Sequence, residues 1–123
     1  MTGINGRILT KGNFRVNNDG VYVNNINTPG MLLIHASWCG HCVRFKPTFN
    51  ELCDDLGSDF ICSSIESEEI TNDLRTALNF KGFPTIKFFD QNGKIIGEYS
   101  GSRNKESILE YICDVYHHCY KYH

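Results

Sequence analysis

Two cysteines separated by two residues offer the clearest chemistry in this sequence: Cys39 and Cys42, within Trp38-Cys39-Gly40-His41-Cys42. A thiolate attacks a disulfide sulfur to form a mixed disulfide, and a second thiol one helical turn away can resolve that intermediate. The spacing therefore fits a redox pair in which Cys39 attacks and Cys42 resolves. Half of a zinc site has the same spacing, so the pair alone leaves redox chemistry and metal binding about equally open.

The residues on either side predict that the pair lies between a buried strand and a helix. Residues 31–36 form a nearly continuous apolar run, typical of a strand buried on both faces. Residues 40–56 carry apolar side chains at helical spacing. This junction puts Cys39 at the positive end of the helix dipole, which stabilises its thiolate. A protonated His41 would add positive charge nearby and make the disulfide a better oxidant.

The rest of the chain predicts an α/β fold with a central mixed sheet flanked by helices. The further elements we expect are a strand at 60–65, a helix at 68–80, two antiparallel strands at 85–89 and 94–99, and a last helix at 104–116. The N-terminal segment is rich in Asn and Gly, and residues 14–16 and 21–23 flank a turn-forming stretch. That pattern predicts a short hairpin.

Four separated motifs resemble the thioredoxin superfamily, and most closely the catalytic domains of protein disulfide isomerase. They are the stretch from Trp38 to Cys42, Pro47, the run from Gly82 to Phe89, and the segment from Glu98 to Arg103. The resemblance implies a thioredoxin-like fold, and we expect one domain over residues 1–123. Its parts would be an atypical Asn-rich segment at 1–29, a core at 30–116 and a tail at 117–123.

The resemblance also implies roles for residues outside the cysteine pair. Pro84 is expected to follow a cis peptide bond and to face the cysteines, while the backbone of Phe83 grips extended substrate peptide. Trp38 is expected to cover the disulfide at the surface. Arg103 is expected to approach the active site and lower the pKa of Cys42. The implied substrates are cysteine-containing proteins, and no cofactor beyond the cysteine pair is implied.

One buried position departs from the family pattern. Relatives place an acid six residues before the first cysteine, where it takes the proton of the second, but this chain has Leu33. The lysine that accompanies this acid is also missing, and Ser64 is its counterpart. His35 shares a strand face with Leu33 and could replace the missing base. Alternatively, its imidazole only fills an aromatic position and bonds a backbone group.

The other four cysteines fall into two groups, each with its own interpretation. Cys53 and Cys62 are expected to be small, buried, unpaired side chains without a role. The tail holds five residues of metal-binding type: Cys113, His117, His118, Cys119 and His123. Two pairs among them have i, i+4 spacing and could bind a metal, but side chains this near a terminus often bind nothing.

Charge and hydropathy exclude two classes of partner. The formal net charge of −2 gives no reason to expect nucleic acid, and no apolar run is long enough to span a membrane. Because the N-terminus shows no secretory leader, we expect a reducing cytoplasm in which cysteines are not paired, with a virion or an oxidising compartment left open.

We therefore expect a protein disulfide oxidoreductase or isomerase whose electron donor or acceptor is unknown. Two other classes remain open. Leu33 and Ser64 would suit a thioredoxin-like binding or structural module whose cysteines turn over little. The tail would suit a metal-binding or redox-sensing protein.

Overall fold

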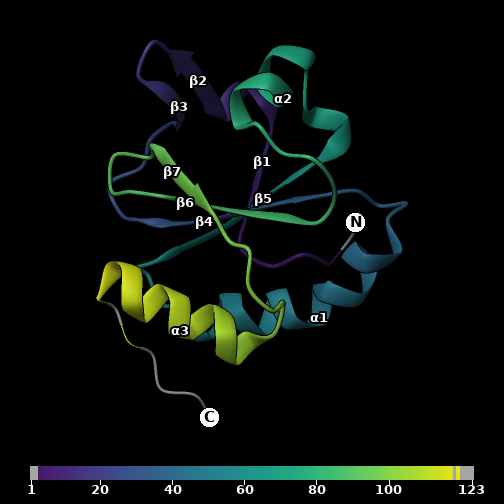
Figure 1. Cartoon of the computed structure of the whole chain (residues 1–123), viewed down its shortest axis with the longest axis vertical. Coiled ribbons are helices and arrows are strands. Elements are labelled where there is room, and N and C mark those ends of the chain that lie inside the picture. The colour runs from purple at the N-terminus through teal and green to yellow at the C-terminus, as the bar shows by residue number, and fades with distance from the viewer. Residues whose placement is uncertain (1–2, 118, 120–123) are drawn as a thin grey trace.

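A five-stranded mixed sheet forms the centre of the molecule (Figure 1) in the computed structural model, which describes residues 3–117 and 119. In spatial order its strands are β1 (Arg7–Leu9), β5 (Ile61–Glu66), β4 (Gly30–His35), β6 (Thr85–Phe89) and β7 (Ile95–Glu98). Strands β1, β5 and β4 are parallel, whereas β6 is antiparallel to both β4 and β7. The predicted α/β fold with a mixed sheet is confirmed.

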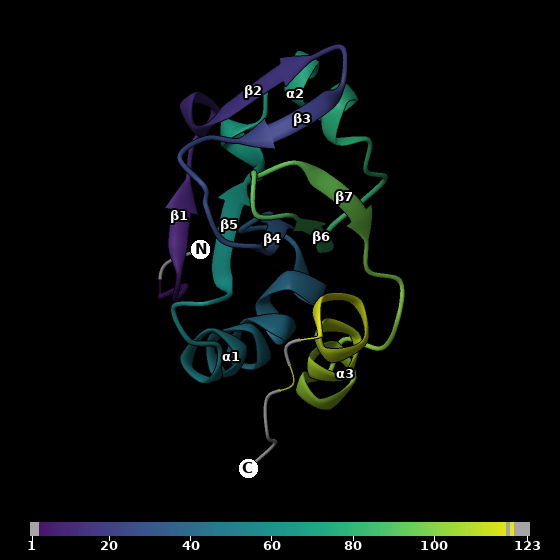
Figure 2. The same cartoon turned by 90° about the vertical axis from the view of Figure 1, so that its left-hand side faces the viewer.

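Helices cover both faces of this sheet, as Figure 2 shows from the side. One face packs against α1 (Gly40–Asp55) and α3 (Lys105–Tyr116), and the other against α2 (Asn72–Leu78) and the hairpin of β2 (Phe14–Asn17) and β3 (Gly20–Val23). Alternate residues of β4 point to opposite faces, as the pleat of a strand requires. All six residues of β4 are consequently buried.

The N-terminal segment contains one element that the sequence did not predict. The expected hairpin is present, with Phe14 opposite Val23. In addition, β1 forms the edge of the main sheet, where Arg7 pairs with Ser63 of β5. Its three residues show no clear alternation of apolar and polar side chains, and so short a segment does not indicate a strand from sequence alone.

The helix expected at 68–80 is shorter than predicted. A 3₁₀ turn at Ser67–Glu69 comes first, and α2 begins afresh after Thr71, whose side chain accepts a hydrogen bond from the backbone N–H of Leu74 at 3.2 Å. The helix ends at Asn79, which adopts a left-handed conformation with φ of 53°. Local capping therefore sets both ends of this helix.

The expectation that Cys53 and Cys62 are unpaired is wrong, because they form a disulfide with a Cα–Cα distance of 5.5 Å. It joins the last turn of α1 to the start of β5. Cys113 and Cys119 form a second disulfide, with a Cα–Cα distance of 4.3 Å. The packing of α1 against β5 sets the first of these distances, which sequence spacing alone does not reveal.

The second disulfide bears directly on the metal site considered for the tail. The sulfurs of Cys113 and Cys119 are bonded to each other, so neither is available as a thiolate ligand. His118 and His123 lie outside the described residues. Within residues 3–117 and 119, no three potential metal-binding side chains gather. Within that same part of the chain, no helix is both long and apolar enough to cross a membrane.

Candidate active site

The end of β4 and the start of α1 position the cysteine pair as the sequence predicted. Cys39 is the N-cap of α1, with extended backbone angles φ −91° and ψ 116°. Its sulfur accepts a hydrogen bond from the backbone N–H of Cys42 at 3.3 Å. Both cysteines are free thiols in this structure. A thiolate at Cys39 would therefore satisfy one of the unpaired N–H groups of the first helical turn.

The surroundings of Cys39 favour its thiolate form. Burial on its own would raise the pKa of this thiol. Hydrogen bonds from the Cys42 side chain and from the backbone N–H groups of Cys42 and His41 outweigh this effect, and the charge of Arg103 adds to them. The net result is a pKa of Cys39 below its usual value, which increases the fraction of nucleophilic thiolate near neutral pH.

Cys42 has the opposite character. Only 1% of this residue is exposed, and burial, with the hydrogen bond and charge of Cys39, raises its pKa to about 12. The backbone N–H of Ala36 and the charge of Arg103 oppose this rise without overcoming it. Cys42 is therefore a thiol near neutral pH and must lose its proton before it can attack. The site combines one activated and one protected thiol.

The loop before β6 lies against Cys39. The peptide bond between Phe83 and Pro84 is cis, and the thiol of Cys39 donates to the carbonyl oxygen of Phe83 at 3.6 Å. Trp38 is 72% exposed and packs edge-on against the ring of Phe83, with centroids 5.4 Å apart. These side chains form an apolar rim around the buried sulfur of Cys39.

Arg103 lies on the other side of Pro84. It lines a cavity of about 190 Å³ together with Pro84, Tyr99 and Gly101. Its positive charge contributes to the lowered pKa of Cys39 and opposes the rise in the pKa of Cys42; the family resemblance implied the effect on Cys42. The segment before α3 thus brings a cation to the redox pair from a distant part of the chain.

His41 has a neighbour that the sequence did not indicate. Arg44 Nη2 lies 2.8 Å from His41 Nδ1, one helical turn further along α1. Because a guanidinium can only donate, Arg44 is the donor in this contact. Arg44 therefore also brings positive charge to the first turns of α1, where the sequence predicted it on His41. The i, i+3 spacing on a helix was the signal that could have found the contact.

The position of the missing acid holds a buried apolar side chain. Leu33 is 1% exposed and lies between Ser64 on β5 and Ile86 on β6. The hydroxyl of Ser64 is buried without a hydrogen-bond partner among the described residues. His35, two residues along β4, is also buried, and its Nδ1 likewise has no partner there. The structure gives no hydrogen bond between His35 and Cys42 in the described part of the chain.

The protonation state of His35 suits a base. Burial lowers its pKa below the usual value, and the carboxylate of Glu66 opposes this only in part. The imidazole is therefore neutral at pH 7 and becomes protonated only on acidification below its ordinary titration range. A neutral ring can take a proton from Cys42, directly or through water.

If His35 is this base, resolution of the mixed disulfide should slow as pH falls through the lowered pKa of His35. His35→Phe should slow resolution at pH 7 by about tenfold to a hundredfold and remove this pH dependence, while leaving the first attack by Cys39 unchanged. Rapid-mixing kinetics that separate attack from resolution provide the measurement. Ser64→Ala is the matched control, because it removes another buried polar group without a titrating proton. Equal resolution rates in wild type and His35→Phe would eliminate His35.

Comparisons with known proteins agree with this geometry. The family model described as Thioredoxin matches residues 8–114. Protein disulfide isomerase-like 1-1 of Arabidopsis thaliana is 33% identical over 97 residues, which are 74% of this chain and 19% of the relative. The protein disulfide-isomerase of Medicago sativa is 38% identical, over 63% of this chain and 16% of the relative. The chain thus spans less than a fifth of these relatives.

A shorter relative is matched over most of its length. Thioredoxin of Gallus gallus is 40% identical over 77 residues, which are 63% of this chain and 70% of the relative. Among solved structures, the zinc-bound form of human ERp44 has a TM-score of 0.62 at 22% identity, over 72% of this chain and 26% of that one. That likeness shows the fold alone. The family model, the relatives and the fold lead to one conclusion: the chain belongs to the thioredoxin family.

Proposed function

We propose that this chain is a protein disulfide oxidoreductase or isomerase that exchanges disulfides with cysteine-containing proteins. With Gly-His between its cysteines, it favours oxidation and isomerisation over reduction. Its relatives support thiol-disulfide oxidoreductase chemistry in general. The observation that carries the proposal is the contrast within the pair, since the pKa of Cys39 is lowered while that of Cys42 is raised to about 12. That contrast separates attacker from resolver.

The two cysteines alone can carry out the complete disulfide exchange. The thiolate of Cys39 attacks one sulfur of a substrate disulfide, the substrate S–S bond breaks, and one substrate thiolate leaves. Cys42 then loses its proton and attacks the Cys39 sulfur, which releases the second substrate thiolate and forms the Cys39–Cys42 disulfide. Two electrons pass to the substrate in this direction, and the reverse sequence oxidises a dithiol. We propose no cofactor beyond this pair.

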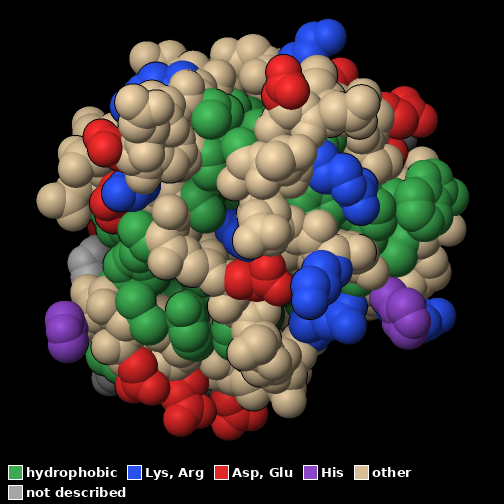
Figure 3. Space-filling view, turned by 45° about the horizontal axis from the view of Figure 1, so that its top comes forward, with side chains coloured by type: hydrophobic (Ala, Val, Ile, Leu, Met, Phe, Trp, Pro, Cys, Tyr) green, Lys and Arg blue, Asp and Glu red, His purple; other side chains and the backbone are tan. Residues whose placement is uncertain are grey.

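The rim of the site suits an extended polypeptide. Trp38 and Val43 are 72% and 51% exposed, and Phe83 lies between Trp38 and the buried sulfur. Apolar side chains around a reactive group fit unfolded substrates, which expose apolar residues of their own. Figure 3 shows Lys, Arg, Asp and Glu side chains interspersed over one face of the molecule. That face lacks the single-sign charge that would attract nucleic acid.

We expect a reduction potential near the isomerase value of about −180 mV rather than the thioredoxin value of about −270 mV. His41→Pro should lower it, because proline has no N–H and the Cys39 thiolate then loses the hydrogen bond that His41 donates. His41→Ala keeps that N–H and should lower the potential less. Equilibration with glutathione at defined ratios, read by mass spectrometry, provides the measurement. A wild-type potential near the thioredoxin value would overturn the proposed direction.

One observation favours a second candidate function. Leu33 and Ser64 stand where relatives place the acid and its lysine, and both are buried. Without that acid, Cys42 could resolve too slowly for turnover, and the chain would act as a thioredoxin-like module that holds unfolded partners. Leu33→Glu separates these functions, because it should accelerate resolution only if proton removal from Cys42 is limiting.

The two additional disulfides bear on the cellular compartment. Cys53–Cys62 and Cys113–Cys119 persist where the environment is oxidising, and a glutathione-reduced cytosol keeps most thiols unpaired. We therefore propose an oxidising compartment, one of the options that the sequence left open, in place of the cytoplasm. Alkylation of Cys53 and Cys62 in freshly lysed cells tests this, since an oxidising compartment leaves both unlabelled.

A further inference from the structure

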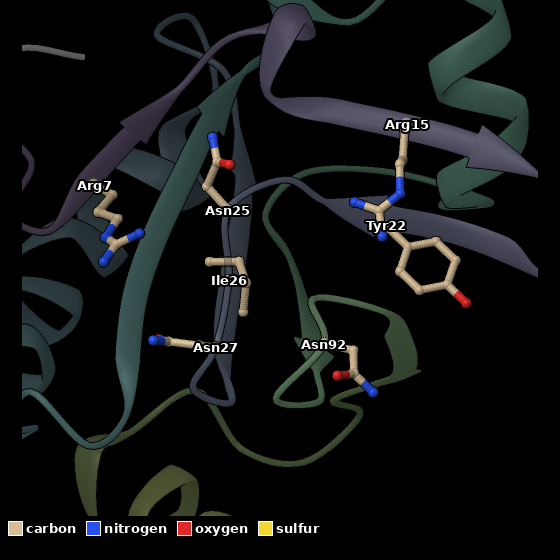
Figure 4. A pocket seen from close by; sticks show the side chains of 7 residues that line it. All are labelled: Arg7, Arg15, Tyr22, Asn25, Ile26, Asn27 and Asn92. Atoms are coloured by element: carbon tan, nitrogen blue, oxygen red, sulfur yellow. The ribbon is translucent and has the colours of Figure 1, made fainter.

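The N-terminal segment surrounds a broad surface depression that plays no part in the redox site (Figure 4). It consists of cavities of about 880 and 350 Å³ that share Arg7, Asn25 and Ile26. We call this continuous surface the arginine basin, and its principal residues are Arg7, Ile8, Arg15, Tyr22, Asn25 and Ile26.

The arginine basin lies at the end of the sheet opposite the cysteine pair. Its wall includes Asn27, three residues before the first residue of β4, and Asn92 in the turn after β6. Cys39 lies four residues after the last residue of β4. The length of β4, six residues or roughly 20 Å, therefore separates the two sites. A ligand in the basin would leave Cys39 accessible.

Backbone hydrogen bonds hold the walls of the basin in place. The N–H of Val23 donates to the carbonyl of Gly93 at 2.8 Å, and the N–H of Asn24 donates to the carbonyl of Asn13 at 2.7 Å. Gly93 approaches the hairpin so closely that a side chain there would collide with the carbonyl of Val23. A preformed surface loses little conformational entropy when it binds a partner.

Two guanidinium groups give the basin a positive charge. Arg15 Nη1 donates to Asn24 Oδ1 at 2.9 Å, and the guanidinium lies 4.4 Å from the centre of the Tyr22 ring. Arg7 stands on the other side of the basin in Figure 4. No acidic residue lines the basin, and within the described part of the chain neither arginine forms an ion pair. This charge is therefore available to an anionic group.

The basin also offers an apolar contact and a free sheet edge. Ile8 is 68% exposed, beside Arg7 on the edge strand β1. Small-molecule sites are mostly enclosed and apolar, whereas this surface is wide and polar, with the Arg and Tyr side chains that contribute most binding energy at protein interfaces. These properties fit a polypeptide better than a small molecule.

We propose that the arginine basin docks an acidic segment of a partner protein. Its carboxylates pair with Arg7 and Arg15, and one apolar side chain covers Ile8. Carboxylates match the planar, paired donors of arginine, so the interaction selects acidic over neutral segments. This docking needs neither cysteine and is independent of the proposed redox function.

The test uses the full chain and a ten-residue peptide of Glu and Ser with one central Leu. Wild-type protein should bind it with chemical-shift changes at the Asn side chains of the basin. The double variant Arg7→Gln, Arg15→Gln should bind at least about tenfold more weakly. Arg75→Gln is the matched control, because Arg75 is exposed, stacks on Phe80 at 4.7 Å, and lies outside the basin. It should bind as wild type does.

Additional peptides, a further protein variant and a competing anion test each part of the proposal. A peptide with Gln in place of Glu, and one with Ser in place of Leu, should both bind more weakly, as should Ile8→Ser protein. Equal binding by the Gln peptide or by the double variant would overturn the proposal. Displacement of the peptide by equimolar pyrophosphate would also overturn it, in favour of a small-anion site. Unchanged alkylation of Cys39 in each variant shows that the fold and the redox site are intact.

Discussion

Cys39→Ser is expected to abolish disulfide reductase and isomerase activity, with a loss of about a thousandfold or more. A serine hydroxyl at this N-cap keeps the hydrogen bond from the backbone of Cys42 but does not attack a disulfide sulfur. The measurement is reactivation of a scrambled-disulfide protein together with reduction of a soluble disulfide substrate. Activity that survives in Cys39→Ser would place the chemistry elsewhere in the chain.

The matched control makes the same substitution three residues later. Cys42→Ser leaves the first attack intact and removes the resolver, so it should accumulate a mixed disulfide between Cys39 and substrate. Alkylation gives independent support. Because the pKa of Cys39 is lowered and that of Cys42 is about 12, iodoacetamide at pH 7 should label Cys39 and leave Cys42 unlabelled. Faster labelling of Cys42 would contradict the assigned roles.

Removing the Cys53–Cys62 disulfide is expected to destabilise the protein by about 2–3 kcal/mol, the loop-entropy value for a closed loop of this size. The bond joins residues nine apart and fixes the last turn of α1 to the start of β5, beside the core residue Phe60. We expect the double variant Cys53→Ala, Cys62→Ala to unfold at a lower urea concentration than wild type, with a similar slope.

Two comparisons isolate the contribution of the bond itself. In reducing buffer both proteins lack the bond, so the remaining difference in unfolding free energy measures only the packing lost with the two sulfurs. The double variant Cys113→Ala, Cys119→Ala should lose less, because its bond attaches only the few residues that follow α3. If removal of Cys53–Cys62 had no effect in oxidising buffer, this disulfide would not stabilise the fold.

The sequence predicted those elements whose patterns are long and local. The apolar run that becomes β4, the helical spacing of α1 and the Asn-Gly turn between β6 and β7 each specify their own conformation. Strand β1 could not be predicted in this way, because its three residues form a strand only beside β5. The extent of α2 depended on caps at Thr71 and Asn79, which interrupt an otherwise helical apolar pattern.

The same distinction applies to the site. The cysteine pair, Pro84 and Arg103 were named from motifs, and the fold brings them together. The pairing of Cys53 with Cys62 was not predictable, because it depends on where a helix end meets a strand start. The contact of Arg44 with His41 lies within one helix, and attention to i, i+3 neighbours would have found it.

Helix α1 has a cysteine sulfur at each of its ends: the reactive Cys39 is its N-cap, and Cys53 lies in its last turn. Fourteen residues separate these two cysteines by about 21 Å of helix, far beyond the reach of one sulfur for another. The protein therefore cannot open its own structural disulfide with its own thiolate. The length of α1 keeps the Cys39 thiolate away from the Cys53–Cys62 disulfide. Reduction of that bond by this protein would therefore require the thiolate of a second copy.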